Sequence, residues 1–160
     1  MTELDRLAAE TLDALRARGL MCATAESCTG GGVAHALTAI PGSSAVFERG
    51  FLVYSNAAKT ELLGVPREVL AEHGAVSEAV AEAMAEGAVS RSAAQVAVGI
   101  TGVAGPGASG SKPEGRVCFA LAAPDRATRV ETVDFGPLGR AEVRAASVLH
   151  ALRLLRDAAD

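Results

Sequence analysis

The sequence is poor in aromatic residues: it has no tryptophan, one tyrosine and four phenylalanines, together 3% of the chain. No stretch approaches the roughly 18 consecutive apolar residues of a membrane-spanning helix, and the N-terminus lacks the apolar core of a signal peptide. The three cysteines, Cys22, Cys28 and Cys118, form no CxxC pair and have no histidine cluster nearby. This argues against a disulfide framework and a zinc site. We therefore expect a cytoplasmic protein with reduced thiols.

An excess of positive charge is also missing. Lysine and arginine number 15 against 19 aspartates and glutamates, which gives a formal net charge of -4. No basic stripe with interleaved aromatic residues is present, so nucleic acid is not the expected partner. A small-molecule substrate is the better expectation.

What the chain has in abundance is small and aliphatic residues, with 49% hydrophobic residues and 17 glycines. Its 160 residues are enough to bury about two-thirds of the unfolded surface, so residues 1–160 are expected to form one domain. The composition favours an α/β protein with a core of alanine, valine and leucine.

Hydrophobic periodicity and turn residues divide the chain into alternating elements. The expected helices span 3–18, 31–40, 56–63, 67–73, 77–92 and 138–156, and the expected strands span 20–25, 46–54, 95–100, 116–123 and 128–135. The short connection between the last two strands predicts an antiparallel hairpin. The pattern predicts a three-layer α/β/α sandwich with a mixed, mostly parallel sheet of about five strands.

The first candidate site is the segment 24–32, TAESCTGGG, where a strand pattern gives way to a helix pattern. A hydroxyl at such a turn can act as a nucleophile among unpaired N–H groups, and glycines let a substrate approach the backbone. Alternatively, Ser27 and Thr29 are helix caps in a tight turn. Cys28 is a weaker nucleophile candidate because no histidine adjoins it.

The second candidate is the segment 53–59, VYSNAAK, at another junction of strand and helix. Lys59 can serve as a general base where burial lowers its pKa, and Ser-Lys pairs are a known variant of serine catalysis. The phenol of Tyr54 is placed to orient or relay a proton. The alternative is that Lys59 lies on a solvated helix face and Tyr54 at the edge of the core.

The third candidate is the glycine-rich segment 99–115, which follows a buried strand. Its backbone N–H groups can face an anion, and Lys112 can add positive charge. Because Pro113 follows Lys112, the segment does not match a nucleotide-binding P-loop. The alternative is a disordered loop, although a loop of this length in a small domain is more often functional.

The fourth candidate is the pair Arg140 and Arg144, which are four residues apart and so share one helix face. Together they can grip a phosphate. Pairing with Glu131 or Glu142 is the alternative.

These motifs together resemble the family of the CinA C-terminal domain. The matching motifs are AESCTGG at 25–31, YSNxxK at 54–59, GITGxAGP at 99–106 and KPxG at 112–115. The family includes stand-alone nicotinamide-nucleotide amidohydrolases. The resemblance implies hydrolysis of nicotinamide mononucleotide to nicotinate mononucleotide and ammonia, without a cofactor or a required metal. A non-catalytic nucleotide-binding domain and an amidase for another small substrate are the alternatives.

The resemblance also implies roles for individual residues. Ser27 would be the nucleophile, Lys59 the base and Tyr54 a partner in proton transfer. The residues expected at the substrate are Cys28, Thr29, Gly30, Gly31, Asn56, Thr101, Gly102, Gly105, Lys112 and Arg140.

Two departures from the family pattern bear on these expectations. The family often has an acidic residue before the arginine of the last helix, where this chain has Gly139. CinA proteins commonly carry a further N-terminal domain resembling molybdopterin-binding proteins, for which 160 residues leave no room. The expectation is therefore a stand-alone deamidase, and its apolar helix faces permit a homo-oligomer.

Overall fold

Five strands form one mixed sheet in the computed structural model, which describes residues 1–160. The strands are β1 (Cys22–Glu26), β2 (Phe47–Leu52), β3 (Val96–Gly102), β4 (Arg116–Ala122) and β5 (Arg129–Asp134), in the spatial order β2-β1-β3-β4-β5. β1 pairs in parallel with β2 and β3, whereas β4 pairs antiparallel with β3 and β5. The expected mixed sheet and C-terminal hairpin are confirmed.

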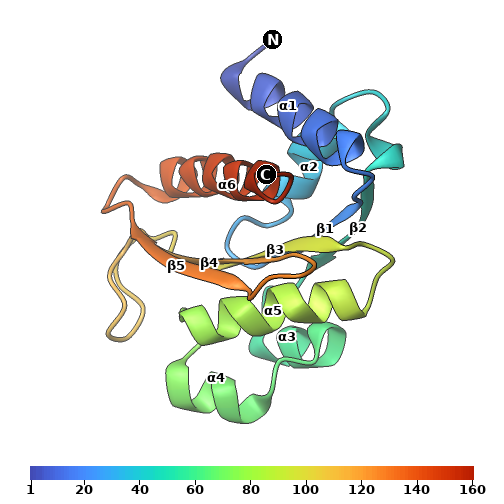
Figure 1. Ribbon diagram of the computed structural model, residues 1–160. Coiled ribbons are helices and arrows are strands. Elements are labelled where there is room, and N and C mark those ends of the chain that lie inside the picture. The colour runs from blue at the N-terminus through green and yellow to red at the C-terminus, as the bar shows by residue number, and fades with distance from the viewer.

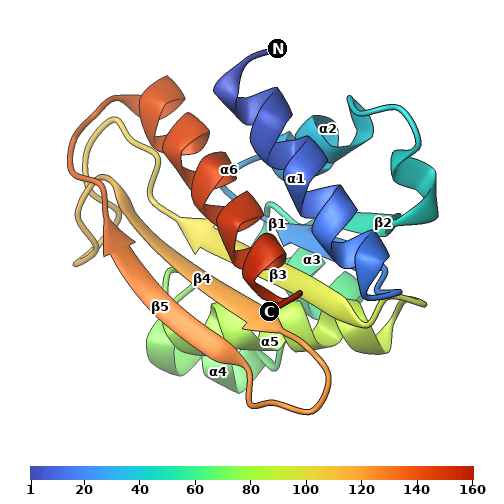
Figure 2. The ribbon, with the colours of Figure 1, turned by 45° about the horizontal axis from the view of Figure 1, so that its top comes forward.

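Helices cover both faces of the sheet, which confirms the three-layer architecture (Figure 1). On one face lie α1 (Glu3–Ala17), α2 (Gly32–Thr38) and α6 (Arg140–Asp157), and on the other lie α3 (Asn56–Leu63), α4 (Arg67–His73) and α5 (Glu78–Ser90). Figure 2 shows α1 and α6 side by side over the sheet. A short 3-10 helix, Ser43–Ala45, precedes β2. None of the helices has the length and apolar character required to cross a membrane.

Local chemistry explains where the elements begin. At α1, the Thr2 hydroxyl accepts from the Asp5 N–H, and the Asp5 carboxylate accepts from the Thr2 N–H, which makes a capping box. The buried face of α1, with Leu7, Leu12 and Leu15, then packs into the core shared with α6. Every residue of β1 is buried, as expected of a central strand between two helical layers.

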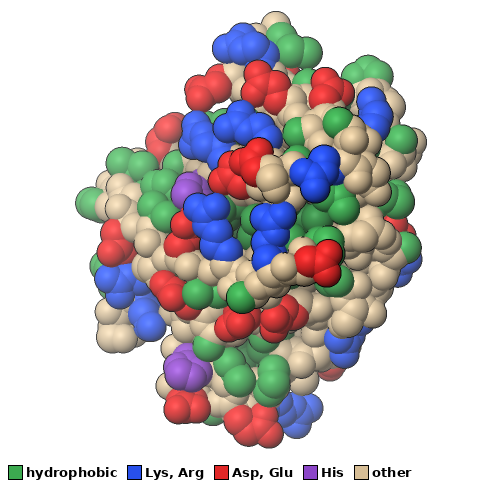
Figure 3. All heavy atoms as spheres, viewed as in Figure 1, with side chains coloured by type: hydrophobic (Ala, Val, Ile, Leu, Met, Phe, Trp, Pro, Cys, Tyr) green, Lys and Arg blue, Asp and Glu red, His purple; other side chains and the backbone are tan.

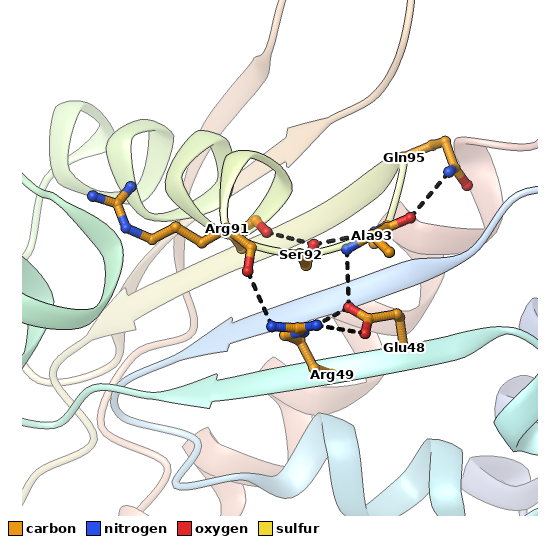
Figure 4. A network of polar contacts seen from close by, with 8 residues as sticks. Glu48, Arg49, Arg91, Ser92, Ala93 and Gln95 are labelled. Atoms are coloured by element: carbon orange, nitrogen blue, oxygen red, sulfur yellow. Dashed lines mark hydrogen bonds and ion pairs between the residues drawn. The ribbon is translucent and has the colours of Figure 1, made fainter.

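Ion pairs lie on the exposed surfaces, where each contributes little to stability. On the face of α1 and α6, acidic and basic side chains interleave (Figure 3), and the pairs include Arg156 with Glu10 at 3.1 Å. At the edge strand β2, Arg49 Nε lies 2.7 Å from Glu48 Oε2, and Arg49 also donates to the carbonyl of Arg91 at the end of α5 (Figure 4). This network ties β2 to the chain that leads into β3.

The parallel strands β1, β2 and β3 end at the same edge of the sheet. In register, Glu26 at the end of β1 lies beside Leu52 of β2 and Ile100 of β3. The chain leaves β1 through α2 on one face to reach β2, and reaches β3 through α3, α4 and α5 on the other face. Open α/β sheets bind ligands in the crevice at such a switch point. The fold therefore brings the first three candidate segments to one edge.

Candidate active site

A tight turn directly after β1 carries Ser27. The Ser27 N–H donates to the carbonyl of Ile100 at 3.0 Å, which continues the pairing of β1 with β3. The Gly30 N–H then donates to the Ser27 carbonyl at 3.1 Å and closes the turn. Gly30 has a φ of 61° and Gly31 a φ of 93°, a left-handed conformation in which glycine avoids the strain of a side chain. The chain thus reverses within a few residues and enters α2.

Glu26, which sequence analysis did not single out, anchors this turn. Its carboxylate is 1% exposed and accepts from the Thr29 hydroxyl at 2.5 Å and from the N–H groups of Val33 and Ala34 at 2.9 and 3.1 Å. The interpretation of Ser27 and Thr29 as caps of α2 is therefore wrong, because Glu26 satisfies these donors. A glutamate at the end of an otherwise buried strand was the available signal.

Lys59 lies on α3, in the layer opposite α2. Ser55 caps that helix by accepting from the Ala58 N–H at 3.0 Å, and Asn56 is its first residue. From the first turn of this helix, Lys59 Nζ donates to Ser27 Oγ at 3.1 Å and to the Tyr54 carbonyl at 3.2 Å. Lys59 is 1% exposed, which rules out the solvated-face alternative.

Burial sets the electrostatics of this pair. It lowers the pKa of Lys59 below its ordinary value, because the charged ammonium is poorly solvated there. Burial also raises the pKa of the neighbouring Cys28 to about 12, so this cysteine remains a thiol. Of the two adjacent nucleophile candidates, Ser27 is the one in contact with a base.

The phenol of Tyr54 makes no hydrogen bond to Ser27 or to Lys59. Tyr54 is 61% exposed, and its hydroxyl accepts from Arg140 NH2 at 2.9 Å. Its contact with Lys59 is made through the backbone carbonyl. The other terminal nitrogen of Arg140 donates to the Gly105 carbonyl at 2.6 Å, so Arg140 links Tyr54 to the glycine-rich loop.

Arg140 and Arg144 occupy different places. Arg144 donates to the carbonyls of Cys28 and Thr29, at 3.2 and 3.4 Å, and does not line the cavity that Arg140 faces. Neither arginine pairs with Glu131 or Glu142; Glu131 contacts Arg129 and His150 instead. Gly139 precedes Arg140 with a φ of 96° and a ψ of 151°, a conformation confined essentially to glycine. This accounts for glycine at a position that is often acidic in the family.

A cavity of about 330 Å³ opens at this edge of the sheet, above Ser27 and Lys59. Nine predicted site residues line it: Ser27, Cys28, Tyr54, Asn56, Lys59, Thr101, Gly102, Gly105 and Arg140. Thr29, Gly30, Gly31 and Lys112 do not. Sequence analysis missed Ala75 and Val76, which come from the connection between α4 and α5. The Thr101 hydroxyl holds that connection by donating to the Ala75 carbonyl at 2.8 Å.

The lining of the cavity contains no aspartate or glutamate, whereas Arg140 contributes a positive charge. The backbone N–H groups of Cys28 and Thr29 donate to no acceptor in the chain. The cavity thus combines a serine in contact with a buried lysine, the free N–H of Cys28 and the cation of Arg140, and the free N–H of Thr29 belongs to the adjoining turn. This arrangement suits a ligand that carries both a carbonyl group and an anion.

These features define an α/β/α domain with a ligand-sized cavity at the switch point of its sheet. The chain belongs to the family of the CinA C-terminal domain, whose family model matches residues 4–159. The predicted family is therefore confirmed.

Individual relatives carry two kinds of name. The chain is 55% identical over 122 residues to the nicotinamide-nucleotide amidohydrolase PncC of Escherichia coli, covering 76% of this chain and 74% of the relative. It is 51% identical over 151 residues to a putative competence-damage inducible protein of Symbiobacterium thermophilum, covering 89% of this chain but 35% of the relative. The chain thus spans only about a third of the longer relatives.

The fold of this chain matches that of a solved structure over its whole length. The crystal structure of the competence/damage inducible protein CihA from Agrobacterium tumefaciens superposes with a TM-score of 0.96 at 45% identity, covering 100% of this chain and 98% of that one. The fold described above is therefore that of known members of the family.

Proposed function

We propose that this chain hydrolyses the carboxamide of nicotinamide mononucleotide, producing nicotinate mononucleotide and ammonia through an acyl-enzyme on Ser27. The observation that carries the proposal is the 3.1 Å contact between Lys59 Nζ and Ser27 Oγ at the base of a cavity lined without carboxylates. The similarity to the amidohydrolase of Escherichia coli supports the choice of substrate.

Acylation begins with neutral Lys59. Its Nζ takes the proton of the Ser27 hydroxyl while Oγ attacks the carboxamide carbon, and the lowered pKa of Lys59 supplies the neutral amine. The negative charge that develops on the carboxamide oxygen is held by the free N–H groups of Cys28 and Thr29. Gly30 contributes structure to this turn instead of a donor, because its N–H already binds the Ser27 carbonyl.

The tetrahedral intermediate then collapses. Its C–N bond breaks, and the Lys59 ammonium gives its proton to the departing nitrogen, which leaves as ammonia. Water next attacks the nicotinoyl ester as Lys59 takes one of its protons. That proton returns to Ser27 Oγ when the ester bond breaks, which regenerates the serine and releases nicotinate mononucleotide.

Arg140 is proposed to bind the phosphate of the mononucleotide. It is the charged side chain of the cavity wall, and both of its hydrogen-bond partners, the Tyr54 hydroxyl and the Gly105 carbonyl, are neutral. A phosphate can therefore approach the guanidinium without displacing a carboxylate. The phenol of Tyr54 orients that guanidinium, and its predicted part in proton transfer is tested separately below.

The decisive experiment measures ammonia released from nicotinamide mononucleotide by the purified protein and by Ser27→Ala and Lys59→Ala. Both substitutions are expected to lower kcat by at least about a thousandfold, since each removes a member of one catalytic unit. Ser44→Ala, on the exposed surface, is the matched control and should retain full activity.

The outcomes separate the alternatives. Binding of the mononucleotide without ammonia release by the wild type would indicate a nucleotide-binding domain and overturn the proposed activity. Full activity in Ser27→Ala would leave the substrate in place but overturn the acyl-enzyme mechanism.

A further inference from the structure

Arg144, on α6, contacts the turn that carries Ser27 without lining the cavity. Its Nε donates to the Cys28 carbonyl at 3.2 Å and its NH2 to the Thr29 carbonyl at 3.4 Å. We propose that Arg144 is a positioning residue that fixes the Thr29 N–H, one of the two oxyanion-binding donors of this turn. The inference rests on the proposed function, because it assigns a role in the same acyl transfer.

The geometry of the peptide group carries the argument. In a trans peptide, the carbonyl of one residue and the N–H of the next lie in one plane and point in opposite directions. When Arg144 holds the Cys28 carbonyl, the Thr29 N–H is directed away from Arg144. That N–H is one of the two donors in the turn without an acceptor in the chain. Holding the carbonyl therefore fixes the direction of a free donor.

The charge of Arg144 adds to this effect. A hydrogen bond from a guanidinium polarises the carbonyl that accepts it, and polarisation of a peptide group makes its N–H a stronger donor. None of the ion pairs of the protein includes Arg144. Its charge is therefore directed at the two carbonyls and is not neutralised by a carboxylate.

The surroundings of Arg144 are built for this contact. A Cβ atom on Gly30 would lie 2.8 Å from Arg144 NH2, so the glycine leaves room for the guanidinium. Arg144 stands in the second turn of α6, from where its guanidinium reaches the carbonyls of Cys28 and Thr29.

An arginine is suited to this role because its planar fork reaches two carbonyls at once, which the single ammonium of lysine cannot do in the same geometry. Arg144→Met is expected to lower kcat for the mononucleotide about 10- to 100-fold, less than the roughly 100- to 1,000-fold loss when an oxyanion donor is removed outright, because the N–H itself stays in place. KM should change less than about twofold, because Arg144 does not line the cavity. Arg144→Lys should give an intermediate kcat.

The acid limb of the pH profile provides a second signature. Because burial lowers the pKa of Lys59, the midpoint of that limb should stay in place in Arg144→Met while the plateau falls. Arg153→Met is the matched control: this arginine lies on the same helix and pairs with Glu3 at 3.5 Å on the surface. It should show wild-type kcat and KM.

A measurement that needs no substrate separates this inference from the proposed activity. The rate at which a fluorophosphonate modifies Ser27, followed by intact mass, depends on the same oxyanion donors but not on recognition of the mononucleotide. We expect slower modification in Arg144→Met and Arg144→Lys than in Arg153→Met. If the wild type releases no ammonia yet this difference persists, the substrate is wrong and the role of Arg144 stands.

Three results would overturn the role of Arg144. The first is a folded Arg144→Met variant whose kcat and whose rate of Ser27 modification both equal those of the wild type. Another is a rise in KM as large as the fall in kcat, which would indicate substrate binding. If thermal unfolding shows that Arg144→Met does not fold, Arg144→Lys carries the test, and wild-type rates in that variant contradict the two-carbonyl grip.

Discussion

Lys59 Nζ lies 3.1 Å from Ser27 Oγ although the two residues belong to opposite layers of the domain. Ser27 follows the central strand β1 and leads into α2 on one face of the sheet, whereas Lys59 stands on α3 on the other face. The pair therefore meets around the carboxyl end of β1. A second contact with the Tyr54 carbonyl holds the amine of Lys59, and no carboxylate that would favour its charged form lines the cavity.

The first prediction concerns pH. An ammonium cannot accept the Ser27 proton, so kcat/KM should fall tenfold per pH unit below the pKa of Lys59 and reach a plateau above it. Since burial lowers that pKa from 10.5, the plateau should begin below pH 10.5. Profiles measured with nicotinamide riboside, which lacks a titrating phosphate, control for ionisation of the substrate. A rate that keeps rising through pH 10.5 would contradict a desolvated base.

Much of this arrangement follows from patterns that are local in the sequence. Helical periodicity and turn residues located every α-helix and strand, with ends that differ by a few residues, but not the short 3-10 helix Ser43–Ala45. The helix expected over 31–40 is Gly32–Thr38, and the strand expected over 46–54 is Phe47–Leu52. The end of a strand depends on its neighbour's register, which local periodicity does not contain.

The parts of the site that sequence analysis missed depend on contacts between distant segments. Glu26 lies one residue beyond the strand expected over 20–25, and its role appears only when the start of α2 folds back onto it. Arg140 and Arg144 share a helix face in sequence, yet the loop at Gly105 and the turn at Cys28 separate their contacts. Spacing along one helix predicts neither partner.

The second prediction tests phosphate recognition. Arg140→Met should raise KM for nicotinamide mononucleotide about 10- to 100-fold, because it removes a charge-assisted hydrogen-bond donor for the phosphate. KM for nicotinamide riboside, which has no phosphate, should change little. Steady-state ammonia release from both substrates measures the difference. An equal loss on both would place Arg140 in a structural role instead.

The third prediction concerns the phenol of Tyr54. Tyr54→Phe removes the hydroxyl that accepts from Arg140 but keeps the backbone carbonyl that holds Lys59. The loss of about one neutral hydrogen bond, roughly 1 kcal/mol, should raise KM about fivefold and leave kcat within about twofold. A fall in kcat of a hundredfold or more at constant KM would instead assign the phenol to proton transfer, as the family resemblance implies.

The fourth prediction concerns the support of the nucleophile turn. Glu26→Ala removes the acceptor of three donors, namely the buried Thr29 hydroxyl and Val33 N–H and the half-buried Ala34 N–H. Unsatisfied buried donors cost about 1–3 kcal/mol each, so the free energy of unfolding should fall by at least about 2 kcal/mol. Glu26→Gln keeps one amide oxygen as an acceptor, so its free energy of unfolding should fall less than that of Glu26→Ala. Urea unfolding measures both variants, with Glu10→Ala on the exposed face of α1 as control.

The same substitution should also affect catalysis, because this turn carries Ser27 and its free N–H groups. Folded Glu26→Gln should therefore have a lower kcat at unchanged KM. A kcat equal to that of the wild type would mean that Arg144 and the turn's own hydrogen bond suffice to hold the donors in place.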